Sequence, residues 1–244
     1  MIEPAQDDVV GEADDILHGF LEAGGDGALG SWQGTLTQYT FNPYTETWAR
    51  QPDMSRGRWY PTVTKMADNR VVITSGIDET GSNAINNEVE IFTPDPHMDG
   101  IGLMQVVGTH DPSGLYPHQF LLPSGEVLEA GPDALSSFTF DPNAPAASAW
   151  RPMPVMTSDH YYLGNGVSYT DATQSPLRQT IMVAGGHDEK RPMANNEWLD
   201  GHRPASGWAP FPQWNRPRHN ANTIFSVVNT SRAAVCANNL EMWR

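Results

Sequence analysis

Alternating apolar and polar residues divide this chain into short segments that end in turn residues. Residues 62–66 and 70–74 alternate in this way on either side of Asp68-Asn69, a pair typical of a tight hairpin turn. Residues 120–128 repeat the arrangement around Ser124-Gly125. Because a period of two places apolar side chains on one face of a strand, the pattern predicts short antiparallel strands joined by hairpins.

These strand segments recur at a regular spacing. Four of them end in small residues and glycine, and their markers are 52, 55 and 54 residues apart: Gly24, Gly76, Gly131 and Gly185. An aromatic residue, an Asn or Asp and a proline follow in a second strand and turn that lead to Trp48 in one repeat and Trp150 in another. A period of about 50 residues with this order of features is typical of kelch repeats, each of which forms one four-stranded blade of a β-propeller. The alternative is a generic sandwich of short strands.

Glycine and proline support an all-β fold. The chain of 244 residues contains 22 glycines and 20 prolines, so long amphipathic helices are hard to place between them. The first repeat is shortened, because only six residues separate His18 from Gly24 whereas 16 separate Tyr60 from Gly76. The sequence therefore predicts an acidic, disordered lead over residues 1–14 and an incomplete kelch-type β-propeller of about four to five blades over residues 15–244.

The charge and the cysteine content exclude several classes of function. There are 14 basic and 29 acidic residues, a formal net charge of -15, which argues against nucleic acid and anionic membrane surfaces as partners. No apolar run approaches the roughly 18 residues of a membrane span, and the first residues lack the pattern of a signal peptide. Cys236 is the single cysteine, so an internal disulfide and a site with several cysteine ligands are excluded.

Phenols and imidazoles open the innermost strand of each predicted blade. In a propeller these strand starts converge at one mouth of the central channel, although they are about 50 residues apart in sequence. Such a group can hold a transition metal, or the tyrosines can simply be rim residues with their hydroxyls in water. The eight tryptophans can provide stacking platforms for sugars, but Trp48 and Trp150 are expected to pack between blades. The strand-opening residues are Trp59, Tyr60, Tyr116, His118, Tyr161, Tyr162, His219 and Asn220.

Residues 54–76, which contain Arg58-Trp59-Tyr60, resemble a blade of the galactose oxidase/glyoxal oxidase family of kelch-repeat copper-radical oxidases. The Arg-Trp-Tyr form is more similar to the glyoxal oxidase branch. Weaker similarities follow in the same order as in the family, and together they cover roughly residues 15–228; they are residues 115–125, 129–132, 164–169, 181–186 and 216–224.

The resemblance implies a copper site of two tyrosines and two histidines, with one tyrosine cross-linked to a cysteine and carrying a radical. Family members oxidise a primary alcohol or an aldehyde with O2 and release hydrogen peroxide. By motif position, Tyr60 matches the cross-linked tyrosine, so the resemblance implies a catalytic and metal-binding role for Tyr60. It also implies that Trp59, Tyr116, His118 and Tyr162 contact the substrate, which would be a small alcohol, an aldehyde or a carbohydrate.

The chain departs from the family where the remaining ligands are expected. The shortened first repeat has no cysteine, and Cys236 lies in the wrong repeat to reach Tyr60. The family closes with seven blades and is typically secreted, whereas no signal peptide begins this chain, so its localisation is left open. The resemblance thus implies an oxidase fragment that is inactive and binds no copper as this chain. The alternatives are a non-catalytic kelch module that binds a protein or a carbohydrate, and a remnant without function.

Overall fold

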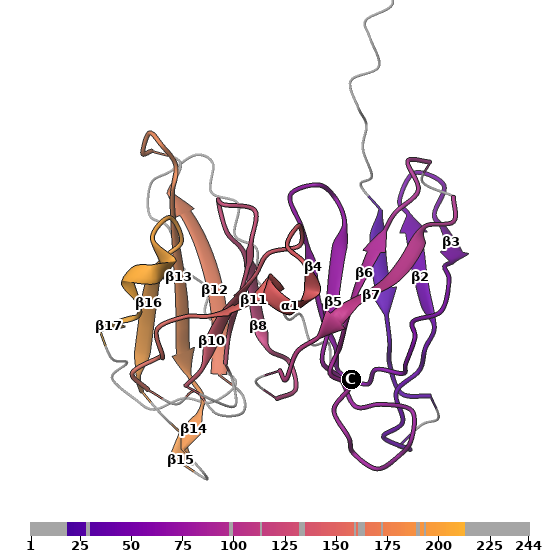
Figure 1. Ribbon diagram of the computed structural model, residues 1–244, viewed down its shortest axis with the longest axis horizontal. Helices are drawn as coiled ribbons and strands as arrows, with labels where there is room; N and C mark the ends of the chain where they lie inside the picture. Colours follow the sequence, from indigo (N-terminus) through magenta and orange to yellow (C-terminus); the bar gives the residue numbers. More distant parts are fainter. Residues whose placement is uncertain are drawn as a thin grey trace, which may run out of the picture.

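Antiparallel β-sheets make up nearly all the regular structure. The computed structural model describes residues 19–212, apart from 28–29, 98–99, 113, 132–134, 159, 161–163, 172, 189–190 and 193. These residues form four antiparallel sheets, none of which closes on itself, and one two-stranded ribbon (Figure 1). The prediction of an all-β fold is confirmed. The predicted lead over residues 1–14 lies outside the described residues.

The strands of each sheet follow one another in sequence order. Sheet 1 contains β1 (Phe20–Ala23), β2 (Gln38–Asn42) and β3 (Thr47–Arg50), and sheet 2 contains β4 (Thr62–Lys65), β5 (Val71–Thr74), β6 (Glu88–Thr93) and β7 (Leu103–Thr109). Sheet 3 contains β8 (His118–Leu121), β9 (Val127–Ala130), β10 (Ser137–Phe140) and β11 (Trp150–Pro152). Sheet 4 contains β12 (Gly164–Asp171), β13 (Arg178–Gly185), β16 (Asn196–Asp200) and β17 (Ala209–Phe211).

Three short elements lie in the connections. The helix α1 (Ala146–Ala149) precedes β11, and the 3-10 turn η1 (Pro204–Ser206) precedes β17. The ribbon of β14 (His187–Asp188) and β15 (Arg191–Pro192) lies between β13 and β16 in the sequence.

Both predicted hairpins are present. Thr62 pairs with Thr74 and Lys65 with Val71 around the turn at Asp68-Asn69. The second hairpin joins β8 to β9 around Ser124-Gly125. Asn69 has a φ of 67°, a left-handed conformation that asparagine tolerates better than most residues.

Hydrophobic side chains fill the spaces between sheets 2 and 3 and between sheets 3 and 4. Between sheets 2 and 3, Val72 and Ile91 pack in one cluster with Val127 and Phe140. A second cluster joins sheets 3 and 4, and its buried residues are Phe120, Leu122, Leu128, Ala130, Met156, Ile181, Val183, Leu199 and Trp208. Because each strand alternates faces, one sheet can take part in two such layers.

A polar contact recurs in three of the sheets. In each of these sheets, the side chain of the first residue of the last strand but one donates a hydrogen bond to a proline carbonyl that follows the last strand. The contacts are Gln38 Nε2 to Pro52 O at 2.5 Å, Ser137 Oγ to Pro154 O at 2.9 Å, and Asn196 Nδ2 to Pro212 O at 2.7 Å. The sequence period therefore corresponds to a repeated structural unit.

The two tryptophans expected between neighbouring units have different surroundings. Trp150 packs against the cluster between sheets 2 and 3, which confirms the prediction for this residue. The prediction for Trp48 is wrong, because 55% of this residue is exposed. Trp48 lies in sheet 1, at one end of the row of sheets (Figure 1).

Candidate functional site

Four aromatic rings from three loops form a continuous aromatic strip. The strip comprises Trp32, Trp59, Tyr60 and Tyr116. The ring centroids of Trp59 and Tyr60 are 3.9 Å apart in a stacked arrangement, and those of Tyr60 and Tyr116 are 4.5 Å apart. Trp32 lies 5.1 Å from Trp59 and is 53% exposed, whereas the other three are half-buried.

The repeat period accounts for three members of the strip. Trp59 and Tyr60 directly precede β4, and Tyr116 precedes β8 at the equivalent position, so the expectation that these strand starts converge is correct. Trp32 was missed, because it lies in the loop between β1 and β2 and shares no spacing with the other three. Tyr161, Tyr162, His219 and Asn220 lie outside the described residues.

Backbone strain is concentrated in the strip. Trp32, Tyr60 and Tyr116 have φ values of 57°, 66° and 55°. Left-handed conformations are unfavourable for bulky side chains, and such residues cluster at functional sites because the surrounding structure must hold them in place. The unfavourable backbone conformations therefore indicate that the positions of these rings are held by the surrounding structure, as at a functional site.

Backbone hydrogen bonds fix the segment that carries Trp59. The N–H of Trp59 donates to Ile77 O at 2.8 Å, and the N–H of Ile77 donates back to Trp59 O at 2.7 Å. Arg58 is held by the segment between β1 and β2. Its N–H donates to Thr35 O at 3.0 Å, and its carbonyl accepts from Gly25 N at 2.8 Å. Segments from sheets 1 and 2 thus hold the centre of the strip.

Two of the marker glycines allow this close approach. A Cβ on Gly24 would lie 2.4 Å from Arg58 O, and a Cβ on Gly76 would lie 2.9 Å from Arg58 Cβ. Both glycines also have positive φ values, of 81° and 94°. Glycine is therefore required at these two positions, because Arg58 approaches their backbone closely.

The Arg58 side chain is fully buried and its guanidinium donates to polar groups. Its Nη2 and Nε donate to Glu90 Oε2 at 2.8 and 3.2 Å, and further hydrogen bonds reach Ser75 O at 2.7 Å and Glu88 O at 2.8 Å. Burial lowers the pKa of Arg58, and the hydrogen bonds and charge of Glu90 partly offset this effect. The other carboxylate oxygen of Glu90 accepts from Ser55 N at 2.7 Å.

We expect Arg58→Met to destabilise the fold by about 3–5 kcal/mol, because it leaves the Glu90 carboxylate buried without its counter-charge. Arg58→Met combined with Glu90→Leu should cost less than Arg58→Met alone, since no lone charge remains. Urea unfolding followed by circular dichroism measures both. Arg178→Met is the control, because the Arg178 side chain is 59% exposed and lies 3.7 Å from Asp200, so this pair should contribute less than about 1 kcal/mol. Equal losses in Arg58→Met and Arg178→Met would contradict this account.

His118 lies in the interior and not in the strip. Only 6% of it is exposed, and its Nε2 has no hydrogen-bond partner among the described residues. Burial, reinforced by the nearby His160, lowers its pKa to about 4. His160 Nδ1 lies 2.8 Å from Gly185 O and its Nε2 lies 3.2 Å from Glu197 Oε1. The substrate-binding role that the sequence implies for His118 stays a prediction.

Acid should destabilise the fold through His118. Its folded-state pKa of about 4 is below the ordinary value of 6.5, so the neutral ring stabilises the folded state fully above pH 6.5. This contribution decreases as the pH falls from 6.5 towards 4, to a limit of roughly 3 kcal/mol. His118→Leu removes the charging step. The difference in unfolding free energy between the two proteins should therefore change across this window, and parallel pH profiles would show that His118 does not titrate this way.

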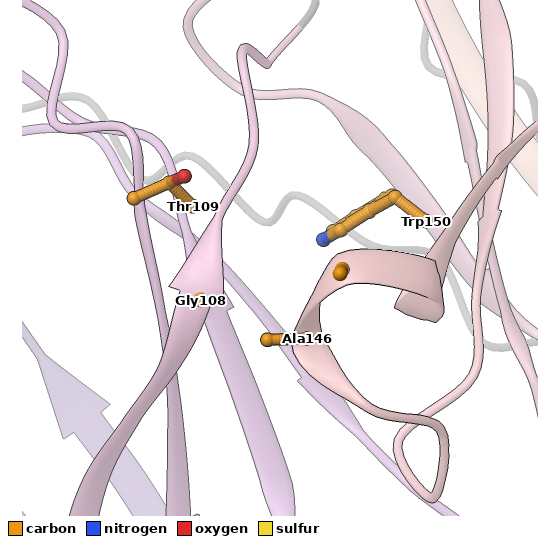
Figure 2. A pocket seen from close by; sticks show the side chains of 5 residues that line it. Gly108, Thr109, Ala146 and Trp150 are labelled. Atoms are coloured by element: carbon orange, nitrogen blue, oxygen red, sulfur yellow. The ribbon is translucent and has the colours of Figure 1, made fainter.

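A shallow recess of about 420 Å³ lies between β7 and α1, lined by Gly108, Thr109, Ala146, Ala147 and Trp150. Figure 2 shows the indole nitrogen of Trp150 directed towards Thr109 across this space. The Trp150 ring stacks on His110 at 3.7 Å, and His110 Nε2 lies 3.1 Å from Glu129 Oε1. His110 therefore occupies one face of the Trp150 indole.

Comparison with known proteins finds little that extends over the whole chain. No family model matches the chain. A WSC domain-containing protein of Arthroderma benhamiae is 31% identical over 140 residues, which is 49% of this chain and 15% of that protein. The chain thus spans a small part of the relative's length.

The assignment to the galactose oxidase/glyoxal oxidase family is therefore wrong. The relative is named for a WSC domain and not for kelch repeats or an oxidase, and no family model matches the chain. The interpretation of the chain as an oxidase fragment is wrong for the same reason, and the expectation of an alcohol or aldehyde substrate has no other support. The catalytic role of Tyr60 rested on that resemblance and loses its support, whereas a metal-binding role for Tyr60 stays a prediction.

Two further expectations concern metals and membranes. Among the described residues, no three His, Cys, Asp or Glu side chains are grouped in a way that could hold a metal ion. That this chain binds no copper stays a prediction. No helix in the described part of the chain is long and apolar enough to cross a membrane.

Proposed function

We propose that this chain is a binding module that takes an oligosaccharide on the aromatic strip. The observation that carries the proposal is the run of four rings, with neighbouring centroids 3.9–5.1 Å apart. The C–H face of a sugar ring packs well on an aromatic face, and a ring with a polar tip suits a ligand that stays partly in water. Trp59 and Tyr60 stack face to face, so the most exposed ring surface for a sugar belongs to Trp32 at the end of the strip.

The net charge of -15 narrows the class of sugar. A strongly acidic protein repels anionic polymers at long range. We therefore propose a neutral oligosaccharide as the ligand, not a sulfated or uronic acid chain.

Polar groups that can hydrogen-bond to sugar hydroxyls lie on the same segments as the strip. Arg56 is three residues before Trp59, and Asp78 directly follows Ile77, the bridge partner of Trp59. Arg56 Nη2 lies 2.7 Å from Asp78 Oδ2 and 3.3 Å from Glu79 Oε1. This ion pair holds its members in defined positions before a ligand arrives, which reduces the entropy cost of binding.

We also propose that the four sheets are consecutive blades of a β-propeller. The first strands of sheets 2, 3 and 4 contact one another in order, as β4 with β8 and β8 with β12. Thr64 Oγ1 hydrogen-bonds to Gln119 Oε1 at 3.0 Å between the first two. Contacts among the first strands support radial packing about a common axis, with the strip where these strands begin.

The proposal predicts that Trp32→Asn weakens sugar binding by about tenfold. Trp32 is the most exposed ring of the strip, and asparagine tolerates its left-handed backbone, so the substitution removes stacking surface without added strain. The probes are neutral hexasaccharides of glucose, mannose, xylose and N-acetylglucosamine, each titrated with calorimetry and tryptophan fluorescence.

Trp48→Asn is the matched control, because Trp48 is equally exposed but lies outside the strip. It should leave the affinity unchanged. If no neutral probe binds, or if both variants lose affinity equally, the strip is not a sugar site. An anionic polymer that binds more tightly than every neutral probe would overturn the choice of a neutral ligand.

A further inference from the structure

One face of sheet 1 carries aromatic side chains that no other sheet of the described residues covers. The strand register places its residues in two rows across the three strands. Phe20 is 64% exposed and Trp48 is 55% exposed. The first row is Phe20, Phe41 and Trp48, and the second row is Glu22, Tyr39 and Arg50. We call these six residues the outer face of sheet 1.

The opposite face of sheet 1 contacts sheet 2. Gln51, which follows β3, donates through Nε2 to Thr40 Oγ1 at 2.8 Å and to Gly100 O at 3.1 Å, and it accepts from Gly102 N at 2.9 Å. Gly100 and Gly102 belong to the segment between β6 and β7. The outer face therefore points away from the other sheets, and sheet 1 lies at one end of the row (Figure 1).

The outer face has the properties of a sheet-packing surface. Phe20 and Phe41 have ring centroids 6.4 Å apart, and Phe41 and Trp48 have centroids 4.9 Å apart. Between sheets 2, 3 and 4, the faces that carry large apolar side chains are buried against a neighbouring sheet. A contiguous exposed group of this kind marks an interaction site.

We propose that a second copy of this chain packs on the outer face and forms a symmetric dimer. A two-fold axis that runs between the two sheets, parallel to β2, keeps each row in place and exchanges the outer strands β1 and β3. Phe41 of one protomer then faces Phe41 of the other, and Phe20 faces Trp48. In the second row, Glu22 of each protomer faces Arg50 of the other.

The charges make this face complementary to itself. A symmetric interface requires that the same patch on both subunits match when rotated. Here the acidic residue lies on one edge strand and the basic residue on the other, in one row, with Tyr39 between them. A second copy provides aromatic contacts for the first row and opposite charges for the second row, which favours it over an unrelated partner. Arg50 also contacts Asp53 at 2.6 Å, but that pair is exposed and holds Arg50 only weakly.

Sedimentation velocity and light scattering of the full chain measure the proposed dimer. The concentration series extends to about 100 µM at about 0.15 M salt, where the net negative charge of each copy is screened beyond about 8 Å. We expect a dimer for the unaltered chain. Arg50→Glu alone and Glu22→Arg alone place like charges opposite each other twice, so each should weaken the dimer at least tenfold.

The combined variant Glu22→Arg with Arg50→Glu provides the decisive comparison. It restores both opposite-charge contacts, so it should recover the dimer that either single change weakens. Lys65→Glu is the control, because it changes the charge as Arg50→Glu does but lies on β4, outside the outer face. Circular dichroism checks that each variant is folded.

Three results would overturn the proposal. They are a monomer at every concentration, a combined variant no better than the single changes, and a Lys65→Glu variant as weak as Arg50→Glu. None of these results bears on sugar binding, since the outer face shares no residue with the aromatic strip.

Discussion

The buried ion pair of Arg58 and Glu90 fixes the junction between sheets 1 and 2. Because a guanidinium in the interior is tolerated only when its donors are satisfied, the positions of Glu90, Ser75 and Glu88 are fixed together. The Arg58 backbone also hydrogen-bonds to Gly25 and Thr35 in the segment between β1 and β2 of sheet 1. Trp59 and Tyr60 follow directly in the chain, so the geometry of the strip depends on this pair.

Sheet 4 contains a related arrangement with a different cation. Glu197 accepts hydrogen bonds from Thr157 N at 2.7 Å and lies 3.2 Å from His160 Nε2, three residues further on. Glu90 accepts from Ser55 N, and Arg58 is likewise three residues further on. In both units a carboxylate on the third strand holds the segment that enters the sheet. Arginine offers a planar fork of five donors and histidine a ring with two nitrogens, so the same carboxylate position is matched by different side chains in the two units.

Local patterns in the sequence were sufficient to predict the two hairpins and the period of the repeat. Asp68-Asn69 and Ser124-Gly125 specify turns through their own backbone preferences, and Gly24 and Gly76 are required by a close backbone approach. The family assignment failed because Arg58-Trp59-Tyr60 is explained by packing: a buried cation, a bridging strand residue and a strained ring. Trp48 and Trp150 have similar sequence surroundings. Their burial differs because Trp150 packs against a neighbouring sheet, whereas Trp48 lies on the outer face of sheet 1. Trp32 could not be found, since its contact with Trp59 is set by tertiary structure.

The three strands of sheet 1 have one neighbouring sheet, whereas sheets 2 and 3 each have two. In a row of units that contact only their neighbours, resistance to local opening decreases towards the ends. Trp32 belongs to this terminal unit, while Tyr60 and Tyr116 belong to inner ones. Transient opening of sheet 1 would therefore remove Trp32 from the aromatic strip and leave the other three rings in place. The number of rings in the strip thus depends on the local stability of sheet 1.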